Sequence, residues 1–573
     1  MQEMNDQYKA RLDKLSKFKE MGVNPYPHKF DRTHTSELLR EKKEELLKSE
    51  EKIAFAGRVV RYNRKGKLCF MHLKDRYGRL QVVCAKDLVG ESDYEIVKMI
   101  DFGDIVGVTG SMMETHTGEY SVKADKIEML AKAIRPLPVP KEIVDENGNK
   151  KVFNEFKDVD TRYRERYIDM ALNDDVREVF LKRSRILQAI REYLLENKFI
   201  EVETPTLQPI YGGANARPFT THHNAADMTL YLRVAPELYL KRCIVGGMER
   251  VFEFSKNFRN EGMDRNHNPE FTCMELYVQY KDYNWMMSFT EKLLETVCIA
   301  VNGTTEREID GQTISFKAPY RRLPILDAIK EKTGFDCNGK TEDEIRAFCK
   351  EKGMDIDDTM GKGKLIDELF GEFCEGTFIQ PTFITDYPVE MSPLTKMHRS
   401  KPGLTERFEL MVNGKELANA YSELNDPIDQ EERFVEQMKL ADKGDDEAMI
   451  IDQDFLRALQ YGMPPTSGIG IGIDRLVMLM TGKTFIQEVL FFPQMRPEKK
   501  APRSSNDEWK NIGVAEQWIP VFNKCGYYLV SDIREVNPQK LQQDVCGVNK
   551  KYKLGYDNPK VEEFAAWIEN ANK

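Results

Sequence analysis

At 573 residues and 41% hydrophobic content, the chain is long enough for about two to four domains and too apolar to be disordered throughout. A formal net charge of −10 excludes nucleic-acid binding through overall charge, so any such contact requires a local basic patch. The 10 cysteines include no C-x-x-C pair and no run of about 20 apolar residues is present, which argues against a zinc ribbon, a disulfide framework and a membrane span. The first residues lack the apolar region of a secretory signal, and we expect reduced thiols in the cytoplasm.

The N-terminal part changes its pattern near residue 52. Residues 6–22 and 35–52 have the composition of charged, solvated helices, whereas residues 52–130 contain short strands, glycine turns at "RKGK" and "RYGR", and a helix near "SDYEIVKMID". This order predicts a small all-β barrel of the oligonucleotide-binding (OB) type. Basic and aromatic residues gather there, as on a surface that stacks single-stranded nucleic acid, although a solvated basic hairpin fits them equally well: Arg58, Arg61, Tyr62, Arg64, Lys65, Lys67 and Phe70.

A proline-bearing, charged linker, "RPLPVPKEIVDENGNKKVF", separates the barrel from a long amphipathic segment. Residues 176–199 carry apolar side chains at spacings of three and four, which predicts a core helix. "IEVETPTL" follows as a strand that ends at Pro205. Whether this unit is also an interface is left open by the pattern.

Two strands joined by the polar loop "GMDRNHNP" place charged side chains on one face of a sheet. On the second strand the alternation of side chains groups Phe271, Cys273, Glu275, Tyr277 and Gln279, with an apolar set on the opposite face. The first strand groups Glu253, Ser255, Asn257 and Arg259 in the same way. Charges on a partly buried face are costly unless they have a function, and the alternative is a solvated face of an antiparallel sheet.

Two stretches downstream have related features. "RFELMVNGKELANAYSELND" has an Asn413-Gly414 hairpin turn, after which Asn419, Tyr421 and Glu423 share a face. In "GIGIGIDRLVMLMTG" glycines repeat at every second position, so one face of that strand has no side chains. The spacing differs from the dinucleotide-binding G-x-G-x-x-G, and the bare face either admits a flat ligand or packs tightly on another element.

These stretches resemble the signature motifs of class II aminoacyl-tRNA synthetases. The helix with "EVETPTL" is similar to motif 1, "FRNEGMDRNHNPEFT" to motif 2 and "GIGIGIDRLVML" to motif 3. "GGANARPFTTHHNAADMTLYLRVAPELYLKR" and "YSELNDPIDQ" are typical of the lysyl-tRNA synthetase family, and the similarity covers about residues 50–500 in continuous order. The resemblance implies an α+β fold, in which an antiparallel sheet flanked by helices follows an all-β OB barrel.

From these patterns and the resemblance we predict five regions. They are an N-terminal helical segment (1–50), an OB anticodon-binding domain (51–135), a linker (136–160), a catalytic domain (161–500) with a helical insertion at about 320–385, and a C-terminal helical extension (501–573). The extension has helical apolar spacing in three places, with Trp518, Phe522, Leu541, Phe564 and Trp567 as candidates for a small core. It resembles helix-hairpin-helix modules weakly, and a docking or dimer-stabilising appendage fits it at least as well.

The family activity implied is that of a lysine–tRNA ligase: L-lysine is activated with ATP and Mg²⁺ to lysyl-adenylate, pyrophosphate is released, and the lysyl group passes to the 3′-end of tRNA(Lys). The implied assembly is a homodimer through residues 176–205. By resemblance Arg259 and Arg475 are catalytic, Glu409 and Glu416 bind magnesium, and the ATP site comprises Arg259, Glu261, His267, Asn268, Phe271, Glu409 and Arg475. A general base is not needed, because the lysine carboxylate is already an anion at pH 7.

The implied lysine site contains three carboxylates, which reject an acidic substrate and favour one with two ammonium groups. Glu237 is expected to take the α-amino group and Glu423 with Tyr277 the ε-ammonium, while Glu275 suits either. An aspartyl or asparaginyl enzyme shares the architecture, but an aspartate site should supply a cation instead. The implied set is Gly213, Ala214, Glu237, Arg259, Glu275, Tyr277, Asn419, Tyr421 and Glu423.

The hairpin at Asn413-Gly414 creates a conflict within these assignments. Strict alternation puts Glu409 and Glu416 on one face and Asn419, Tyr421 and Glu423 on the other. A β-bulge near Leu417–Ala418 would return all of them to one face. Without a bulge, one of the two sets is wrong.

The OB domain is expected to read a U-rich anticodon. By resemblance Phe70 stacks on a base, Gln81 and Glu119 bind base edges, and Arg58 is a weaker candidate. Two other functions are considered: a paralogue with the same fold that modifies a protein or makes a small molecule, and a non-catalytic nucleic-acid-binding or scaffold protein. The OB segment argues against the first, and the complete set of motif residues argues against the second.

Overall fold

A computed structural model describes residues 6–49, 51–138, 141–144, 150–153, 156–357, 360–441, 450–497, 503–552 and 554–573. The chain divides into two compact units. The second holds Glu261–Met263, Asn268–Glu270 and Pro493–Lys573, and the first holds the rest. Within these described ranges, no helix is both long and apolar enough to cross a membrane.

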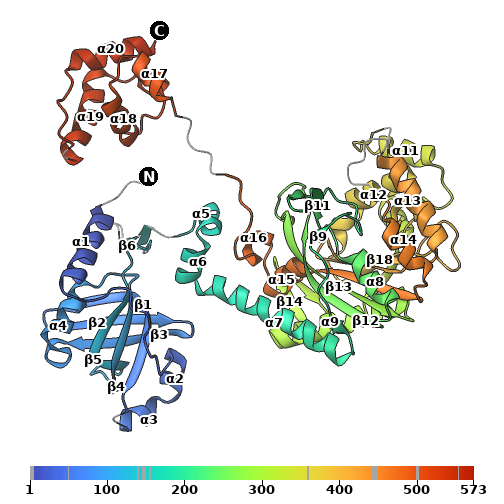
Figure 1. The fold of residues 1–573 in the computed structure, drawn as a ribbon, viewed down its shortest axis with the longest axis horizontal. Helices are drawn as coiled ribbons and strands as arrows, with labels where there is room; N and C mark the ends of the chain where they lie inside the picture. Colours follow the sequence, from blue (N-terminus) through green and yellow to red (C-terminus); the bar gives the residue numbers. More distant parts are fainter. Residues whose placement is uncertain are drawn as a thin grey trace. The chain divides into compact units, whose positions relative to one another are not determined.

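The N-terminal region of the first unit is a closed barrel, drawn in blue in Figure 1. Its strands follow the order β1-β2-β3-β5-β4, with bounds β1 (Ile53–Lys65), β2 (Leu68–Asp75), β3 (Gly78–Ala85), β4 (Ile105–Glu114) and β5 (Tyr120–Ala131). Helix α4 (Lys86–Met99) joins β3 to β4. This confirms the predicted OB barrel. The preceding helices are α1 (Asp6–Glu20), α2 (Ser36–Glu41) and α3 (Lys43–Lys48), and α1 is less solvated than expected because its Phe18 is buried in the barrel core.

An eight-stranded sheet, counted over the described residues, is the centre of the first unit's second half. Its order is β16-β17-β18-β19-β20-β13-β12-β8, and the ladders from β17 to β13 are antiparallel. Among the described ladders of this sheet, the outer pairs β16–β17 and β12–β8 are parallel. The strands are β8 (Ile200–Glu201), β12 (Arg250–Phe258), β13 (Glu270–Gln279), β16 (Arg321–Pro324), β17 (Thr382–Thr385), β18 (Arg407–Val412), β19 (Lys415–Ser422) and β20 (Thr466–Gly472).

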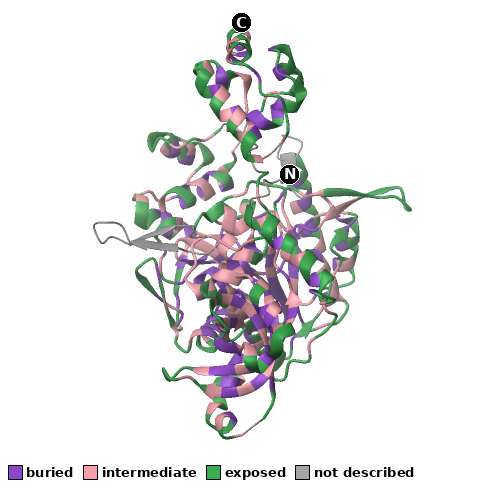
Figure 2. Ribbon diagram, turned by 90° about the vertical axis from the view of Figure 1, so that its left-hand side faces the viewer, coloured by how far each residue is buried: buried purple, intermediate pink, exposed green. Residues whose placement is uncertain are grey.

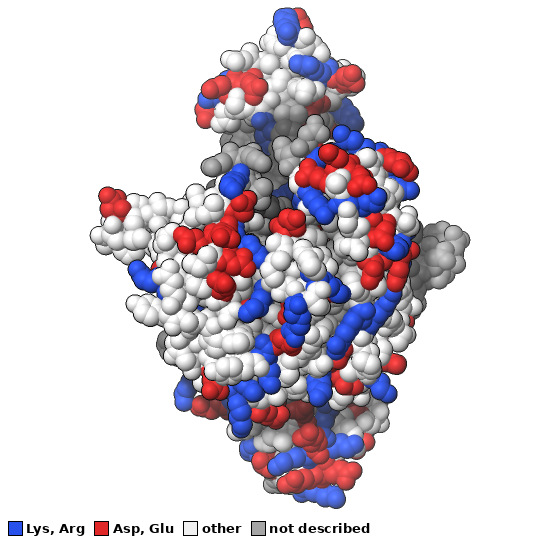
Figure 3. Space-filling view, turned by 90° about the vertical axis from the view of Figure 1, so that its right-hand side faces the viewer, with Lys and Arg blue, Asp and Glu red and all other residues white. Residues whose placement is uncertain are grey.

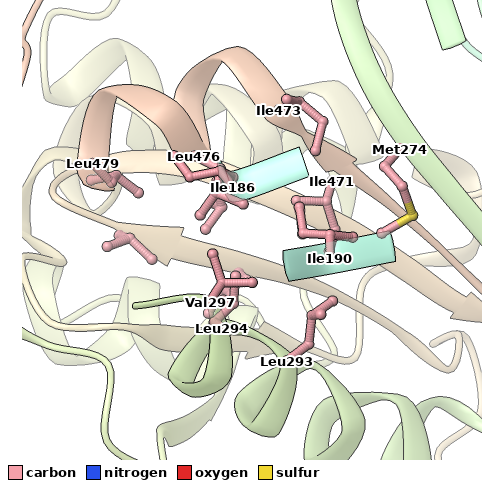
Figure 4. Packing of buried hydrophobic residues seen from close by; sticks show 14 of the residues in the cluster. Ile186, Ile190, Met274, Leu293, Leu294, Val297, Ile471, Ile473, Leu476 and Leu479 are labelled. Carbon is pink, nitrogen blue, oxygen red and sulfur yellow. The ribbon is translucent and has the colours of Figure 1, made fainter. Parts of the chain in front are cut away.

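Three helices cover one face of this sheet. They are α7 (Asp174–Glu196), α9 (Tyr283–Asn302) and α15 (Ile473–Thr481). Figure 4 shows Ile186 and Ile190 of α7, Leu293 and Leu294 of α9, and Ile471 of β20 within one buried cluster. The apolar spacing of residues 176–199 therefore predicted a real core helix. The strand after it is shorter than predicted, since only Ile200 and Glu201 pair with β12.

The remaining helices and strands complete the first unit. Helices α10, α11 and α12 occupy the predicted insertion between β16 and β17 and share their own buried cluster. The bounds are β6 (Lys141–Val144), β7 (Lys150–Phe153), α5 (Val159–Arg164), α6 (Arg166–Leu172), β9 (Leu207–Gln208), β10 (Thr220–His223), β11 (Met228–Leu232), α8 (Glu237–Val245), β14 (Glu306–Ile309), β15 (Gln312–Ser315), α10 (Ile325–Thr333), α11 (Glu342–Glu351), α12 (Lys362–Phe373), α13 (Pro427–Ala441), α14 (Gln453–Gln460) and α16 (Ile486–Val489).

The C-terminal part of the second unit is helical and has its own core. Its helices are α17 (Asn506–Asn511), α18 (Ile519–Lys524), α19 (Pro538–Tyr552) and α20 (Val561–Ala571). All the predicted core residues are in this cluster, together with Trp509 of α17, which the sequence did not single out. The three predicted helical stretches correspond to α18, α19 and α20.

Burial and charge follow the fold. In Figure 2 the buried residues gather inside the barrel, in the sheet and on the inner sides of the helices, while exposed residues mark the outer helix faces and loops. On the face drawn in Figure 3, Lys and Arg side chains alternate with Asp and Glu, without a large area of one sign. On the face that Figure 3 shows, charge alone therefore does not mark a binding site.

Candidate active site

Three neighbouring strands, β13, β20 and β19, bring four of the nine predicted amino-acid-binding residues together, and a fifth, Glu423, directly follows β19. Two rows in register cross the sheet: Glu275, Gly470, Asn419 and Glu409 form one, and Tyr277, Gly468, Tyr421 and Arg407 form the other. Paired residues of neighbouring strands lie on the same face, so both rows belong to one surface. The glycines of β20 leave the middle of that surface without side chains.

The glycines of β20 differ in what they allow. A Cβ atom on Gly468 would overlap the Tyr277 ring and the Glu423 carboxylate, so these side chains fill the space over this glycine. A Cβ atom on Gly470 would meet Glu275 Cγ at 3.5 Å, and one on Gly472 would meet Leu417 O at 3.6 Å, both ordinary contacts. Close packing thus explains Gly468, whereas the floor at Gly470 and Gly472 would accept a Cβ atom in ordinary contact.

A group of buried carboxylates borders this floor. Glu237, Glu275 and Glu423 are 4%, 7% and 1% exposed, which leaves little water to solvate their charges. Burial, with the charge of Glu237 second, raises the pKa of Glu275 to about 8, and burial likewise raises the pKa of Glu423 to about 8. Tyr277 Oη donates a hydrogen bond of 3.0 Å to Glu275 Oε2. These three carboxylates need cationic partners to stay ionised at neutral pH.

One cation already lies in this group, and the sequence reasoning missed it. Lys241, one turn after Glu237 on α8, donates from Nζ to Glu237 Oε1 at 2.6 Å, and its Nζ lies 2.5 Å from Glu423 Oε2. In the sequence, a Glu and a Lys four residues apart look like an ordinary surface pair on a helix. Only the position of β19 shows that the pair is buried.

The predicted turn at Gly213 and Ala214 lies against the same helix. Gly213 has φ +90°, a left-handed conformation that favours glycine, and a Cβ atom there would approach Glu237 Cβ to 3.0 Å. The turn is therefore held next to Glu237, as the resemblance implied.

The predicted bulge in β19 is confirmed. Leu410 pairs with Ala418 and Met411 pairs with Glu416, so Leu417 is an extra residue in β19. Beyond it Asn419 faces Glu409, and the two sets of residues that strict alternation had separated share one face. Leu417 itself points to the apolar core.

Two carboxylates on this face, Glu409 and Glu416, are the predicted metal ligands. Burial raises the pKa of Glu409 to about 7, Arg407 opposes this rise, and the charge of Glu416 adds to it. Arg407, a residue that the sequence reasoning missed, donates to Glu409 Oε1 at 2.5 Å and to Asn419 Oδ1 at 3.1 Å. Arg407 could have been found from the sequence, because it lies two residues before Glu409 on one strand and therefore shares its face.

Two arginines of the predicted nucleotide site contact other residues of that site. The Arg259 guanidinium lies 5.1 Å from the centre of the Phe271 ring, and its Nε is buried without a hydrogen-bond partner among the described residues. Arg475 donates to Glu416 O at 2.5 Å and lies 3.1 Å from His267 Nε2. His267 Nδ1 in turn lies 2.8 Å from Asp264 Oδ2.

A pocket lies beside Arg475. Its charged lining residues are the cations Lys415, Arg475 and Lys483 and the carboxylates Asp310 and Glu416. Asp474 precedes Arg475 at the start of α15 and holds this end of the helix in place. It accepts a hydrogen bond of 2.7 Å from Thr272 N and forms an ion pair of 2.6 Å with Arg183. The start of α15 is thereby fixed to both β13 and α7.

Glu261 and Asn268 belong to the second compact unit and are described there by their own contacts. Glu261 is exposed. Asn268 donates to Glu270 O at 2.6 Å and accepts a hydrogen bond of 3.3 Å from Gln494 N. Asn268 therefore ties the loop after β12 to the segment that follows α16.

The barrel brings two of the predicted anticodon residues into direct contact. Gln81 Nε2 donates to Glu119 Oε2 at 2.6 Å, and His72, which the sequence reasoning missed, lies 3.1 Å from Glu119 Oε1. Phe70 is on the same face of β2 as His72 and is half-buried. Arg58 donates to Gly103 O at 2.8 Å, an internal contact that explains this residue structurally.

The described residues hold no group of three or more His, Cys, Asp or Glu side chains arranged as a metal site. The pair Glu409 and Glu416 is consistent with this result, because two carboxylates do not form a complete cage. Such a pair suits Mg²⁺, which takes few carboxylates and completes its coordination with phosphate oxygens and water.

Comparison with known proteins matches this geometry. Residues 158–496 match the family described as tRNA synthetases class II (D, K and N), and residues 53–130 match the OB-fold nucleic acid binding domain. A lysine–tRNA ligase of Porphyromonas gingivalis is 54% identical over 575 residues, 99% of each chain. A lysine–tRNA ligase of Christiangramia forsetii is 57% identical over 560 residues, 96% of each chain. The chain therefore belongs to the lysine–tRNA ligase family of class II tRNA synthetases.

Proposed function

We propose that the chain activates L-lysine with ATP to lysyl-adenylate, with release of pyrophosphate, and transfers the lysyl group to the 3′-end of tRNA(Lys). The observation that carries this proposal is the group of buried carboxylates Glu237, Glu275 and Glu423 beside an open sheet face. Buried carboxylates require cations, and L-lysine brings two ammonium groups at pH 7. An aspartate side chain would meet repulsion in the same place.

The amino-acid site uses one carboxylate for each ammonium group. Glu237 takes the α-ammonium, and Glu423 with Tyr277 takes the ε-ammonium, while Glu275 adds negative charge between them. The aromatic ring of Tyr421 forms a wall for the aliphatic stem of the substrate. Asn419 and the Gly213–Ala214 turn complete the site.

The activation step is an in-line attack of the lysine carboxylate on the α-phosphate. This carboxylate is already an anion, so the residues must neutralise charge and hold the two reactants in line rather than remove a proton. Arg259, whose buried Nε has no hydrogen-bond partner among the described residues, bridges the substrate carboxylate and the α-phosphate. Phe271 and Arg475 enclose the adenine, Glu261 reads its amino group, and His267 and Asn268 lie in the loop that covers the phosphates.

Glu409 and Glu416 would hold Mg²⁺ at the phosphates. Bound Mg²⁺ supplies charge neutralisation of the phosphate oxygens. The shared face of the two carboxylates and the raised pKa of Glu409 support this role, because a cation between them would relieve their repulsion.

The remaining assignments follow from the family. The OB domain binds the anticodon through Phe70, Gln81 and Glu119, two copies form a homodimer through residues 176–205, and the enzyme acts in the cytoplasm. The domain division at residues 50, 135, 160 and 500 belongs to the same proposal. A monomer mass in light scattering of the dilute protein would contradict the dimer.

Lysine-dependent exchange of pyrophosphate into ATP tests the activity. We expect exchange with L-lysine and not with L-aspartate or L-asparagine. The Glu423→Gln variant should raise the KM for lysine more than tenfold with little change in the KM for ATP, because it removes one of the charges that select the substrate. Glu431→Gln, an exposed change on α13, is the control. Absence of lysine-dependent exchange in the wild type would overturn the proposal.

Charging of tRNA tests the OB domain separately. Phe70→Ala should weaken tRNA recognition by about 1–3 kcal/mol, the usual value of one base stacked on an aromatic ring, and leave pyrophosphate exchange unchanged. Tyr77→Ala, which removes an exposed aromatic ring from the same barrel, serves as the control. If Phe70→Ala lowers exchange and charging equally, Phe70 has a structural role only.

A further inference from the structure

Lys241 is a cation that has no role in the proposed reaction, yet it is completely buried. Its side chain is 0% exposed, and its Nζ lies 2.6 Å from Glu237 Oε1 and 2.5 Å from Glu423 Oε2. A lysine is almost never buried to this extent without paired charges. Here the two partners are the carboxylates assigned to the two ends of the substrate.

The net charge of the pocket can be compared with the charge of the two substrate ammonium groups. In the substrate complex, where all three are ionised, Glu237, Glu275 and Glu423 contribute three negative charges and Lys241 contributes one positive charge, while the nearby Arg407 is paired with Glu409. The resulting excess of two negative charges equals the two ammonium charges of L-lysine. The substrate carboxylate is neutralised separately by Arg259. Without Lys241 one carboxylate would remain buried and uncompensated after the substrate had bound.

Lys241 also sets where these carboxylates lie. Glu237 is on α8, whereas Glu423 directly follows β19, and the Lys241 ammonium is the charged group that joins them. Only Oε2 of Glu423 faces Lys241. The other oxygen, Oε1, is buried over Gly468 and has no side-chain hydrogen-bond partner among the described residues.

We propose that Lys241 is a positioning and specificity-determining residue: it acts as a resident third ammonium that fixes Glu237 and Glu423 and makes the pocket select a substrate with two ammonium groups. This inference rests on the proposed function and extends it to a residue that does not touch the reacting atoms. It predicts that the charge of Lys241 matters more than its length or its contribution to the fold of α8.

Removal of the Lys241 charge has a definite consequence for pH dependence. A carboxylate that loses its cation in a buried site takes up a proton rather than remain charged. That proton must leave before a substrate ammonium can bind, so lysine binding should weaken at low pH and recover as the pH rises. The titratable and charged groups that face this cluster are Glu237 of α8, Glu253 of β12, Arg259, Glu275 and Tyr277 of β13, Arg407 of β18, Tyr421 of β19, and Glu423.

The experiment compares full-length variants in lysine-dependent pyrophosphate exchange between pH 6.5 and 8.5. Lys241→Met should raise the KM for lysine at least tenfold at pH 6.5, with the ratio to wild type falling to about threefold or less at pH 8.5. The KM for ATP should change less than twofold. Calorimetry in buffers of different ionisation enthalpy should show about one more proton released per lysine bound than in the wild type.

Three further variants control for folding. Lys241→Gln replaces Lys241→Met if the latter is not obtained folded. Lys241→Arg keeps the charge and should restore the wild-type pH profile. Arg242→Met breaks the ion pairs to Asp452 and Asp454 from the same helix, away from the pocket, and should leave the KM for lysine unchanged.

Two results would overturn the inference while leaving the proposed function intact. One is an unchanged KM for lysine and an unchanged proton count in the neutral variants. The other is an equal, pH-independent loss in Lys241→Met and Arg242→Met, which would assign Lys241 to the stability of α8 alone. Absence of exchange in the wild type would instead contradict the proposed function itself.

Discussion

At the scale of single residues, Gly468 is the position where a side chain on the sheet would overlap residues of the amino-acid pocket. Tyr277 and Glu423 fill the volume that a side chain there would need. The absence of a Cβ atom is therefore a property of the pocket and not of the backbone, because Gly468 is not among the glycines with a positive φ.

The Gly468→Ala variant should lose lysine-dependent exchange by at least a hundredfold, since the methyl group displaces Tyr277 and Glu423 together. Gly472→Ala is the matched change on the same strand, where a Cβ atom has ordinary contacts, and its KM for lysine should remain within threefold of wild type. Steady-state exchange kinetics measure both. Equal behaviour of the two variants would contradict this account.

The buried carboxylates predict the effect of pH on stability. The folded-state pKa of Glu275 is about 8, above its usual range, so the folded state holds a proton that the unfolded state releases. The contribution of protonated Glu275 to the free energy of unfolding is complete below about pH 4.5 and is lost as the pH rises through about 8. The melting temperature of the ligand-free protein should therefore fall between pH 6 and 8.5. L-lysine should raise it more at pH 8.5 than at pH 6.

Circular dichroism melts at several pH values measure this effect, and the Glu275→Gln variant should show a flatter dependence. A melting temperature that rises with pH over this interval in the wild type, with no difference in Glu275→Gln, would show that other groups control the stability.

At the scale of secondary-structure elements, the bulge at Leu417 decides which residues share a face. Deletion of Leu417 should leave a regular ladder in which Asn419 still opposes Glu409, whereas deletion of Ala420 should put Asn419 and Tyr421 on opposite faces of the sheet. We expect the first deletion to retain measurable exchange and the second to abolish it.

Leu417→Ala controls for the lost side chain, because truncation of a buried leucine alone costs about 2–5 kcal/mol of stability. Activity of the Leu417 deletion should therefore resemble that of Leu417→Ala. If the Leu417 deletion is as inactive as the Ala420 deletion, the twist that the bulge gives to β19 is itself required.

The bulge is an example of a structural feature that could be predicted from the sequence. It was inferred from the conflict between two sets of site residues, since strict alternation could not place Glu409 and Glu423 on one face. The barrel, the helix of residues 176–199 and the bare strand were likewise predictable, because each has a local period or spacing. Lys241, Arg407 and His72 were not predicted, because a buried or half-buried cation or imidazole has the same local pattern as an exposed one. Their burial depends on strands that are distant in the sequence.

At the scale of the whole molecule, the C-terminal helices form a unit with a core of their own. We expect a chain that ends at Pro497 to keep lysine-dependent exchange, because it retains Gln494 and its contact with Asn268. Residues 503–573 should fold alone, with the helical signal of α17–α20. Loss of soluble protein or of exchange in the shortened chain would show that these helices are part of the catalytic fold. A raised KM for tRNA alone would assign them to nucleic-acid binding.

The tryptophans of that C-terminal core also determine which part of this enzyme intrinsic fluorescence measures. Of the four tryptophans in the chain, Trp509, Trp518 and Trp567 are buried in the C-terminal cluster, and only Trp285 lies on α9 beside the sheet. Intrinsic fluorescence will therefore follow the melting of the last 70 or so residues, with a minor signal from the domain that activates lysine. A single fluorescence transition must not be taken for the unfolding of the active site. Conversely, quenching or a spectral shift on addition of tRNA would reveal the C-terminal helices as a contact without any label.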